Sequence, residues 1–313
     1  MELDRLKQTH AAVKAIKGGP DGAGAWFSAY ALCLSGDSPA NLAGALETSH
    51  VALKDALGSW QAPTGSLRWI YAALLTGNGK TASDFVTLRT TLKESAKEAG
   101  TGKLYAGGSR AALVLTLSGA RSASALRRFL AIQKAIQPPW WRANQAITDQ
   151  FAASHAAQDD SPDSVVRARE AALAVFAGAK ATRGLKREGA RLCALYRQPA
   201  REVAERFVAL RAAARELKPI RQTGNRHLYM EWAAQGVTSA DLPVIASHMQ
   251  ALDAVTQTGS ARLRLAQLVW LGERGDGGLG TVSAMSAVIA AQTAAIIAAS
   301  TATSAAVTTT SGP

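Results

Sequence analysis

Apolar residues recur along the chain with the spacing of α-helices. Short, almost wholly apolar stretches (AWFSAYALCL, LRWIYAALL and RAALVLTL) are each followed by a longer amphipathic segment. In two of these longer segments the apolar positions are Phe85, Leu88 and Leu92, and Leu126, Phe129 and Leu130. Runs that alternate strictly between apolar and polar residues are almost absent, so a β-sheet has little support. We therefore predict an all-α protein.

Three turn-like phrases connect these segments and resemble one another. CLSGDSPANL, LLTGNGKTASDF and LTLSGARSASAL contain Gly36, Gly77 and Gly119, which are 41 and 42 residues apart. We expect each glycine at the C′ position of the preceding helix, and a Ser or Asp shortly after it to cap the next helix. With weaker copies downstream, the pattern predicts about six helix pairs in an α-solenoid-like array, a HEAT- or TPR-like superhelix. An irregular helical bundle is the alternative.

The predicted domain organisation follows from where this pattern stops. We assign residues 1–272 to the helical-repeat domain, 273–280 to a glycine-rich flexible linker, 281–308 to an uncharged Ala-rich helix and 309–313 to a tail. The segment 281–308 is long enough to span a bilayer, but Ala, Ser, Thr and Gln dominate it. We expect it to pack against protein, with membrane association or a disordered tail as alternatives.

Positive charge is the most informative feature of the composition. The net charge is +12, which suits nucleic acid, anionic lipid or acidic protein partners without selecting one of them. The excess of positive charge is concentrated between Lys180 and Arg226, a segment that contains 13 Lys and Arg but only four Glu. A projection of the helix around Phe207 places Val203, Phe207, Leu210 and Ala214 on its buried face and most of its arginines in solvent. The basic residues without matching acids form a candidate phosphate-contact strip, namely Arg183, Lys186, Arg187, Arg191, Arg221 and Arg226.

Two adjacent tryptophans mark a second candidate surface. Pro138 and Pro139 end the preceding helix, and neighbouring side chains such as Trp140 and Trp141 cannot both face one core. Tryptophan and arginine are enriched at interface hot spots. Trp140, Trp141 and Arg142 are therefore a candidate partner surface.

The segment Gly77–Thr81 has the sequence GNGKT, which resembles the end of a phosphate-binding loop. That loop requires a glycine five residues before Gly79, and Leu74 occupies this position. The segment also follows an apolar helix rather than a strand. We interpret it as a helix–helix turn.

Other residues that carry chemistry are scattered. His227 and Glu231 share one helix face, but we find no further metal ligands near them in the sequence. Cys33 and Cys193 each lie in an apolar run and are expected to be buried free thiols. The acidic pair Asp159–Asp160 precedes a helix start and is read as an interhelical loop. We predict no catalytic, cofactor or metal site and no enzyme activity, with an enzyme of unrecognised type as the alternative.

The overall layout resembles a bacterial family of uncharacterised all-helical proteins, a domain of unknown function common in Gram-positive species. The shared features are the LRWIYAALL helix at 67–75, the recurring helix pair and the uncharged C-terminal AAQTAAIIAA. This resemblance implies a helical fold but no activity and no site residues.

The function that fits these features is that of a non-enzymatic protein-interaction scaffold with an unknown protein partner. Charge-driven nucleic-acid binding and membrane association through 281–308 are the alternatives, and no small-molecule substrate is indicated. The opening MELDRLKQTH has no apolar region of the kind found in signal peptides, so we expect a cytoplasmic bacterial protein.

Overall fold

The computed structural model describes residues 3–101, 104–138, 144–252 and 259–273. Over these residues the chain folds into fifteen α-helices and three short 3₁₀ helices, with no β-strand. The prediction of an all-α fold is therefore confirmed. Apart from Glu273, the predicted linker, Ala-rich helix and tail lie outside the described residues.

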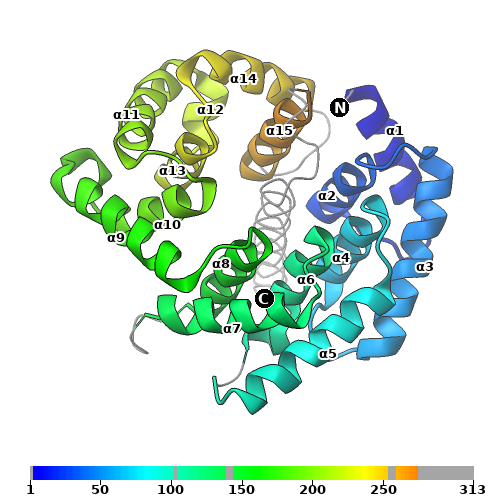
Figure 1. Cartoon of the computed structure of the whole chain (residues 1–313). Helices are drawn as coiled ribbons and strands as arrows, with labels where there is room; N and C mark the ends of the chain where they lie inside the picture. Colours follow the sequence, from blue (N-terminus) through cyan, green and yellow to red (C-terminus); the bar gives the residue numbers. More distant parts are fainter. Residues whose placement is uncertain (1–2, 102–103, 139–143, 253–258, 274–313) are drawn as a thin grey trace, which may run out of the picture. The chain divides into compact units, whose positions relative to one another are not determined.

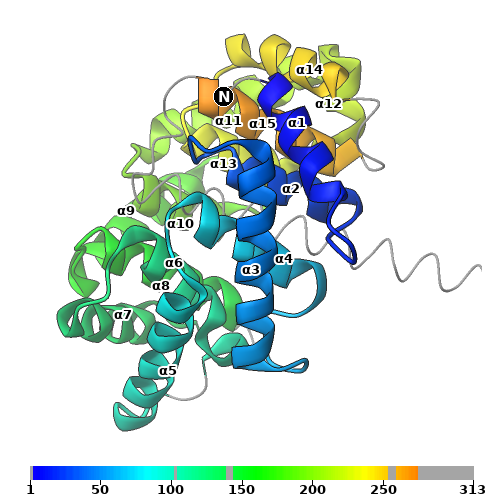
Figure 2. The same cartoon turned by 90° about the vertical axis from the view of Figure 1, so that its right-hand side faces the viewer.

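Packing divides the described part of the chain into two compact units, one within residues 1–90 and 252–313 and the other within residues 91–251. In the first unit α2 packs against α1, α4 and α15, and α3 packs against α1 and α4 (Figures 1 and 2). Its helices are α1 (Leu3–Lys14), α2 (Gly22–Leu32), α3 (Pro39–Leu57), α4 (Gly65–Gly77) and α15 (Gly259–Glu273), while α5 (Ala82–Glu98) spans the division.

The second unit holds the remaining helices. Each of α7 and α9 packs against the α-helix that follows it in the chain, and α7 also packs against α9 (Figure 1). The elements are η1 (Tyr105–Gly108), α6 (Ser109–Ser118), α7 (Ala123–Ile136), α8 (Gln145–Ala157), α9 (Pro162–Gly178), η3 (Lys180–Thr182), α10 (Lys186–Tyr196), α11 (Ala200–Glu216), α12 (Lys218–Thr223), α13 (Arg226–Ala234), η4 (Ser239–Asp241) and α14 (Leu242–Ala251).

Two burial patterns alternate along the chain. Helices such as α2, α4, α6, α8 and α13 are buried at almost every position, as in the unbroken run Leu228–Ala234. The helices between them, such as α3, α9 and α11, bury a single stripe and expose the rest. The stripe of α11 consists of Val203, Phe207, Leu210 and Ala214, as predicted. None of the described helices is both long and apolar enough to cross a lipid bilayer.

Side-chain caps begin the amphipathic helices of the three similar phrases. Ser38 Oγ accepts a hydrogen bond from Asn41 N, and Ser122 Oγ accepts one from Ala125 N. At the GNGKT segment, Thr81 Oγ1 accepts from Asp84 N at 3.1 Å and Asp84 Oδ2 accepts from Thr81 N at 2.9 Å. This reciprocal pair satisfies two backbone donors of α5, and the prediction of a helix–helix turn is confirmed.

The three glycines of these phrases do not share one role, contrary to our prediction. Gly119 is left-handed (φ 76°) and ends α6 as expected. Gly36 lies beyond the end of α2, which is capped at Cys33. Gly77 is the last residue of α4, and a Cβ on it would lie 2.0 Å from the carbonyl oxygen of Ala31. Gly77 therefore allows the close approach of α2 and α4, whereas Gly79 takes the left-handed conformation.

Two histidine–tryptophan stacks recur in the first unit. His10 of α1 stacks on Trp26 of α2 with ring centroids 3.5 Å apart, and His50 of α3 stacks on Trp69 of α4 at 3.6 Å. Burial, reinforced by the positive charge of Lys14 for His10 and of Arg68 for His50, lowers the pKa of each ring to about 4. Both imidazoles are therefore neutral at physiological pH.

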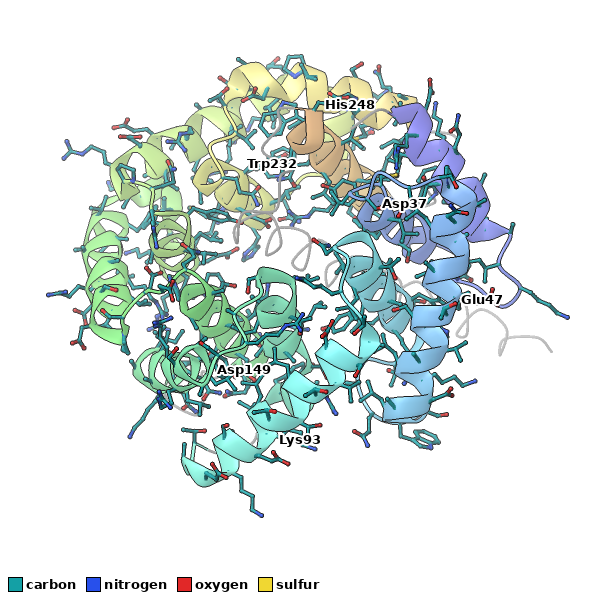
Figure 3. The ribbon with its side chains drawn as sticks, turned by 45° about the vertical axis from the view of Figure 1, so that its right-hand side comes forward. Asp37, Glu47, Lys93, Asp149, Trp232 and His248 are labelled. Carbon is teal, nitrogen blue, oxygen red and sulfur yellow. The ribbon has the colours of Figure 1, made fainter. Side chains whose placement is uncertain are left out.

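A buried carboxylate organises the start of the second unit. Asp149 of α8, labelled in Figure 3, is fully buried. It accepts hydrogen bonds from Tyr105 N at 2.7 Å, Gln133 Nε2 at 2.7 Å and Gln145 Nε2 at 2.6 Å. Burial raises the pKa of Asp149, while these bonds and the nearby charge of Arg110 oppose the rise. The carboxylate ties α8 to α7 and to the turn before α6.

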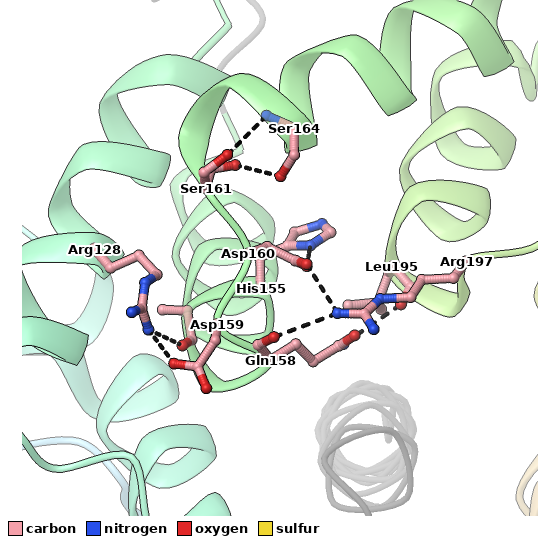
Figure 4. Close-up of polar contacts among 10 residues, drawn as sticks. Arg128, His155, Gln158, Asp159, Asp160, Ser161, Ser164, Leu195 and Arg197 are labelled. Carbon is pink, nitrogen blue, oxygen red and sulfur yellow. Dashed lines mark hydrogen bonds and ion pairs between the residues drawn. The ribbon is translucent and has the colours of Figure 1, made fainter.

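Asp160, in the loop between α8 and α9, binds one residue of α8 and one at the end of α10 (Figure 4). Asp160 Oδ2 bonds Nδ1 of the buried His155 at 2.8 Å, and Asp160 Oδ1 accepts from Arg197 at 2.9 Å. Burial raises the pKa of Asp160, but the bond to His155 and the charge of Arg197 outweigh it and hold this pKa below its usual value. The loop assigned to Asp159–Asp160 from the sequence is confirmed, with Ser161 as the cap of α9.

We expect Asp160→Asn to lower the free energy of unfolding by about 2 kcal/mol, because it weakens charged hydrogen bonds to a buried ring. Asp159→Asn is the matched control. Asp159 is exposed and pairs with Arg128 at the surface, so its loss should cost less than about 1 kcal/mol. Urea unfolding followed by circular dichroism measures both, and equal losses would contradict this account of the loop.

Candidate anion-binding cleft

A cleft of about 320 Å³ lies between α7, α9 and α10 in the second unit. Its walls are mostly apolar, and its charged residues are two arginines and one glutamate. The lining residues are Ala135, Ile136, Gln137 and Pro138 at the end of α7, Val166, Arg169, Glu170 and Leu173 on α9, and Arg187 and Ala190 on α10.

The position of Arg169 follows from the pattern of α9. The buried residues of this helix are Val165, Ala172 and Phe176. Arg169 lies four residues after Val165 and three before Ala172, so it falls on the same face. This face packs against α10, where Gly189 leaves room for Phe176: a Cβ on Gly189 would lie 2.9 Å from the phenyl ring. The close approach of α9 and α10 brings Arg169 toward the arginines of α10.

Arg191 lies within electrostatic reach of two like charges, those of Arg169 and Arg187. Burial, together with the charge of Arg191, lowers the pKa of Arg169 to about 10. Burial also lowers the pKa of Arg191, with Glu188 opposing and Arg187 adding to the effect. We call Arg169, Arg187 and Arg191 the arginine cluster.

Few acceptors or negative charges of the protein itself balance the positive charges of the arginine cluster. Among the described residues, no hydrogen bond or ion pair engages Arg169 or Arg187, and the buried Nε of Arg191 has no acceptor. Glu188, whose negative charge favours the cationic form of Arg191, is bound to Nδ1 of His227. The guanidinium of Arg191 lies over the ring of Phe151 at 5.4 Å from its centroid, which favours the cation but supplies no acceptor.

The predicted phosphate-contact strip is divided among several environments. Arg187 and Arg191 belong to the arginine cluster, whereas Lys186 Nζ donates to Ala177 O. Arg226 donates to the carbonyl oxygens of Ala181 and Arg183, which places Arg183 and Arg226 side by side on the surface. Arg221 is exposed on α12, and no side-chain hydrogen bond or ion pair among the described residues joins it to the other five.

The predicted partner surface Trp140, Trp141 and Arg142 lies outside the described residues. Its neighbour Pro138 lines the cleft. Arg169 is not among the residues predicted from the sequence, because it lies before the segment with the highest positive charge. The signal that indicates it is a charged residue within the buried stripe of a helix.

The other residues considered for metal binding or nucleophilic chemistry are either paired or buried within the fold. His227 is paired with Glu188, and nowhere in the described ranges do three His, Cys, Asp or Glu side chains gather as a metal site would require. Cys33 and Cys193 are buried free thiols, as predicted. Burial raises the pKa of Cys193 to about 12, with Arg206 opposing the rise, so this thiol is a poor nucleophile.

A second hollow of about 430 Å³ lies on the other flank of α9 and is lined largely by alanines. Its charged residue, Arg197, is already bound to Asp160. This hollow therefore offers an anion much less than the arginine cluster does.

Comparison with known proteins adds no further assignment. No protein-family model, curated protein or solved structure matches this chain.

Proposed function

We propose that the protein is a non-enzymatic binding protein, built as an array of helix pairs, that holds an acidic segment of a protein partner in the cleft between α7, α9 and α10. The observation that carries the proposal is that Arg169 and Arg187 line one mostly apolar cleft and form no ion pair with a carboxylate of the described residues, while Arg191 lies close enough to Arg169 to lower its pKa. Arginine forks and apolar contacts together are typical of protein-recognition sites.

The alternation of the two burial patterns supports the array. Each fully buried helix is flanked in the chain by helices that bury a single stripe, as expected for stacked pairs that share a continuous core. The recurrence of the His10–Trp26 and His50–Trp69 stacks at a spacing of about 40 residues points the same way. Such arrays present extended surfaces to their partners.

A protein segment fits the cleft better than duplex nucleic acid does. The volume of about 320 Å³ suits one or two side chains. Duplex binding uses a row of exposed cations along the backbone, whereas Lys186 and Arg226 are engaged by carbonyl oxygens of the chain itself. Arg221 does not line the cleft, which also weakens the nucleic-acid alternative for this site.

The test is the binding of a fluorescein-labelled peptide of alternating Glu and Leu, measured by fluorescence anisotropy. We expect Arg169→Glu to weaken binding at least about tenfold, because a reversed charge faces the acidic ligand. A peptide of alternating Lys and Leu should not bind the unchanged protein.

Arg167→Glu is the matched control for this experiment. Arg167 is an exposed arginine on the same helix and does not line the cleft. If Arg167→Glu and Arg169→Glu reduce the affinity equally, the binding reflects net charge alone and the proposed site is wrong. Tight binding of a 20-base-pair DNA duplex that depends on Arg221 and Arg226 would instead favour the nucleic-acid function.

A further inference from the structure

The guanidinium N–H donors of the arginine cluster that have no acceptor indicate the chemistry of its ligand more specifically than the net positive charge does. Arg169 and Arg187 form no hydrogen bond with the described part of the chain, and Arg191 leaves its Nε buried without an acceptor. For the buried Nε of Arg191 the unmade hydrogen bond costs free energy, whereas the half-buried Arg169 and the exposed Arg187 leave their donors open to a ligand. The site therefore favours a ligand with several oxygens directed at different guanidinium groups.

The oxygen count separates the two common anionic groups of proteins. A carboxylate has two oxygens and one negative charge, and a single arginine fork satisfies it in a bidentate pair. A phosphate monoester has three terminal oxygens and a charge of about −1.5 to −2 at pH 7, so two or three guanidinium groups can bind it at once. Among the described residues that line the cleft, two arginines, Arg169 and Arg187, accompany one carboxylate, that of Glu170, while Glu188 is bound to His227.

The apolar walls define what surrounds the anionic group. Ile136, Pro138 and Val166 line the cleft, and Leu173 is 37% exposed at its edge. Exposed leucine beside cationic donors suits a ligand with an apolar residue next to its anionic one. Free phosphate would leave these walls uncovered.

We propose that this cleft recognises a phosphorylated side chain of a partner peptide, with the phosphate monoester on the arginine cluster and a neighbouring apolar residue against Ile136 and Leu173. This inference rests on the proposed function, since it specifies the acidic group that the cleft holds. Repulsion among the three arginines, which an anion relieves, also supports it: burial and the charge of Arg191 lower the pKa of Arg169.

The experiment compares three fluorescein-labelled peptides on the full chain, with the sequences Gly-Leu-X-Leu-Gly, where X is phosphoserine, glutamate or serine. We expect the phosphoserine peptide to bind at least about tenfold more tightly than the glutamate peptide, which corresponds to about 1.4 kcal/mol. The serine peptide should not bind. Lowering the pH from 7.5 to 5.5 should weaken phosphoserine binding, because the second phosphate pKa is about 6.

Variants assign the binding to the cleft. Arg169→Gln and Arg187→Gln should each weaken phosphoserine binding at least about tenfold, while Arg167→Gln should leave it unchanged. Leu173→Ser should weaken the peptide but not inorganic phosphate, which serves as a competitor. Far-ultraviolet circular dichroism of each variant shows that the helices are retained, and Arg187 is exposed at the surface, so its replacement should not disturb folding.

Each result has a defined meaning. Equal affinity for the phosphoserine and glutamate peptides overturns the phosphate inference and leaves the acidic-partner function standing. Competition by inorganic phosphate at the same concentration as the peptide overturns the peptide part and assigns a free-phosphate site. Absence of binding by both acidic peptides overturns the inference and the proposed function together.

Discussion

Gly77→Ala should lower the free energy of unfolding by at least about 3 kcal/mol, and folding itself should become inefficient. The added Cβ would lie 2.0 Å from Ala31 O and 2.9 Å from Ala31 C. These are backbone atoms in the last turn of α2 and cannot move aside as a flexible side chain would. The two helices must separate, which opens the core around Trp26 and Tyr71, and overpacking of this kind is among the strongest single-residue effects.

The control for this prediction is Gly44→Ala in α3. Gly44 lies within a helix with no atom within 4 Å of its added Cβ. Alanine there should raise stability by about 0.5 to 1 kcal/mol, because it favours the helix more than glycine does. Urea unfolding followed at 222 nm gives both values. A loss below about 1 kcal/mol for Gly77→Ala would show that α2 and α4 do not approach as described.

The first unit should lose about 4 kcal/mol of stability between pH 6.5 and pH 4. Burial, aided by the charges of Lys14 and of Arg68, lowers the pKa of His10 and of His50 to about 4. In the unfolded chain both rings titrate near 6.5, so the unfolded state binds more protons in this window and stability falls as the pH falls. One pKa unit corresponds to about 1.4 kcal/mol, and partial exposure reduces the effect to about 2 kcal/mol for each ring.

The double replacement His10→Phe with His50→Phe isolates this effect. Phenylalanine keeps a ring against Trp26 and against Trp69 but cannot be protonated. We expect the unfolding free energies of the variant and the original protein to run parallel above pH 7 and to diverge by about 4 kcal/mol at pH 4. If the two unfolding free energies stay parallel down to pH 4, protonation of the stacked histidines does not destabilise the folded protein, and this account of the stacks is wrong.

Helix type and helix register followed directly from the sequence pattern. The stripe of α11 and the caps Ser38 and Ser122 were predictable because periodicity and capping depend on residues close in the chain. The role of Gly77 was not, because it depends on Ala31, a residue of another helix. The sequence contains no local signal for a contact between helices that are more than 40 residues apart.

The candidate site shows the same limit. The charge excess after Lys180 indicated Arg187 and Arg191 but not Arg169, which joins them through the packing of α9 on α10. The exposure of Trp60 was not predicted from the sequence. Trp60 is 96% exposed, on a loop held by hydrogen bonds from Arg68 to Gly58 O and Pro63 O. A solvent-exposed tryptophan on a loop has no periodic pattern that would distinguish it from a core residue.

The claim that the arginine cleft holds an acidic partner is tested most directly by methyl nuclear magnetic resonance. With labelled Ile, Leu and Val methyl groups, the alternating Glu and Leu peptide is titrated into the full chain. The account predicts that the signals of Ile136, Val166 and Leu173, which line the cleft, shift first and saturate together. Shifts confined to methyl groups outside the cleft, such as those of the exposed Val51 or Val244, would contradict it.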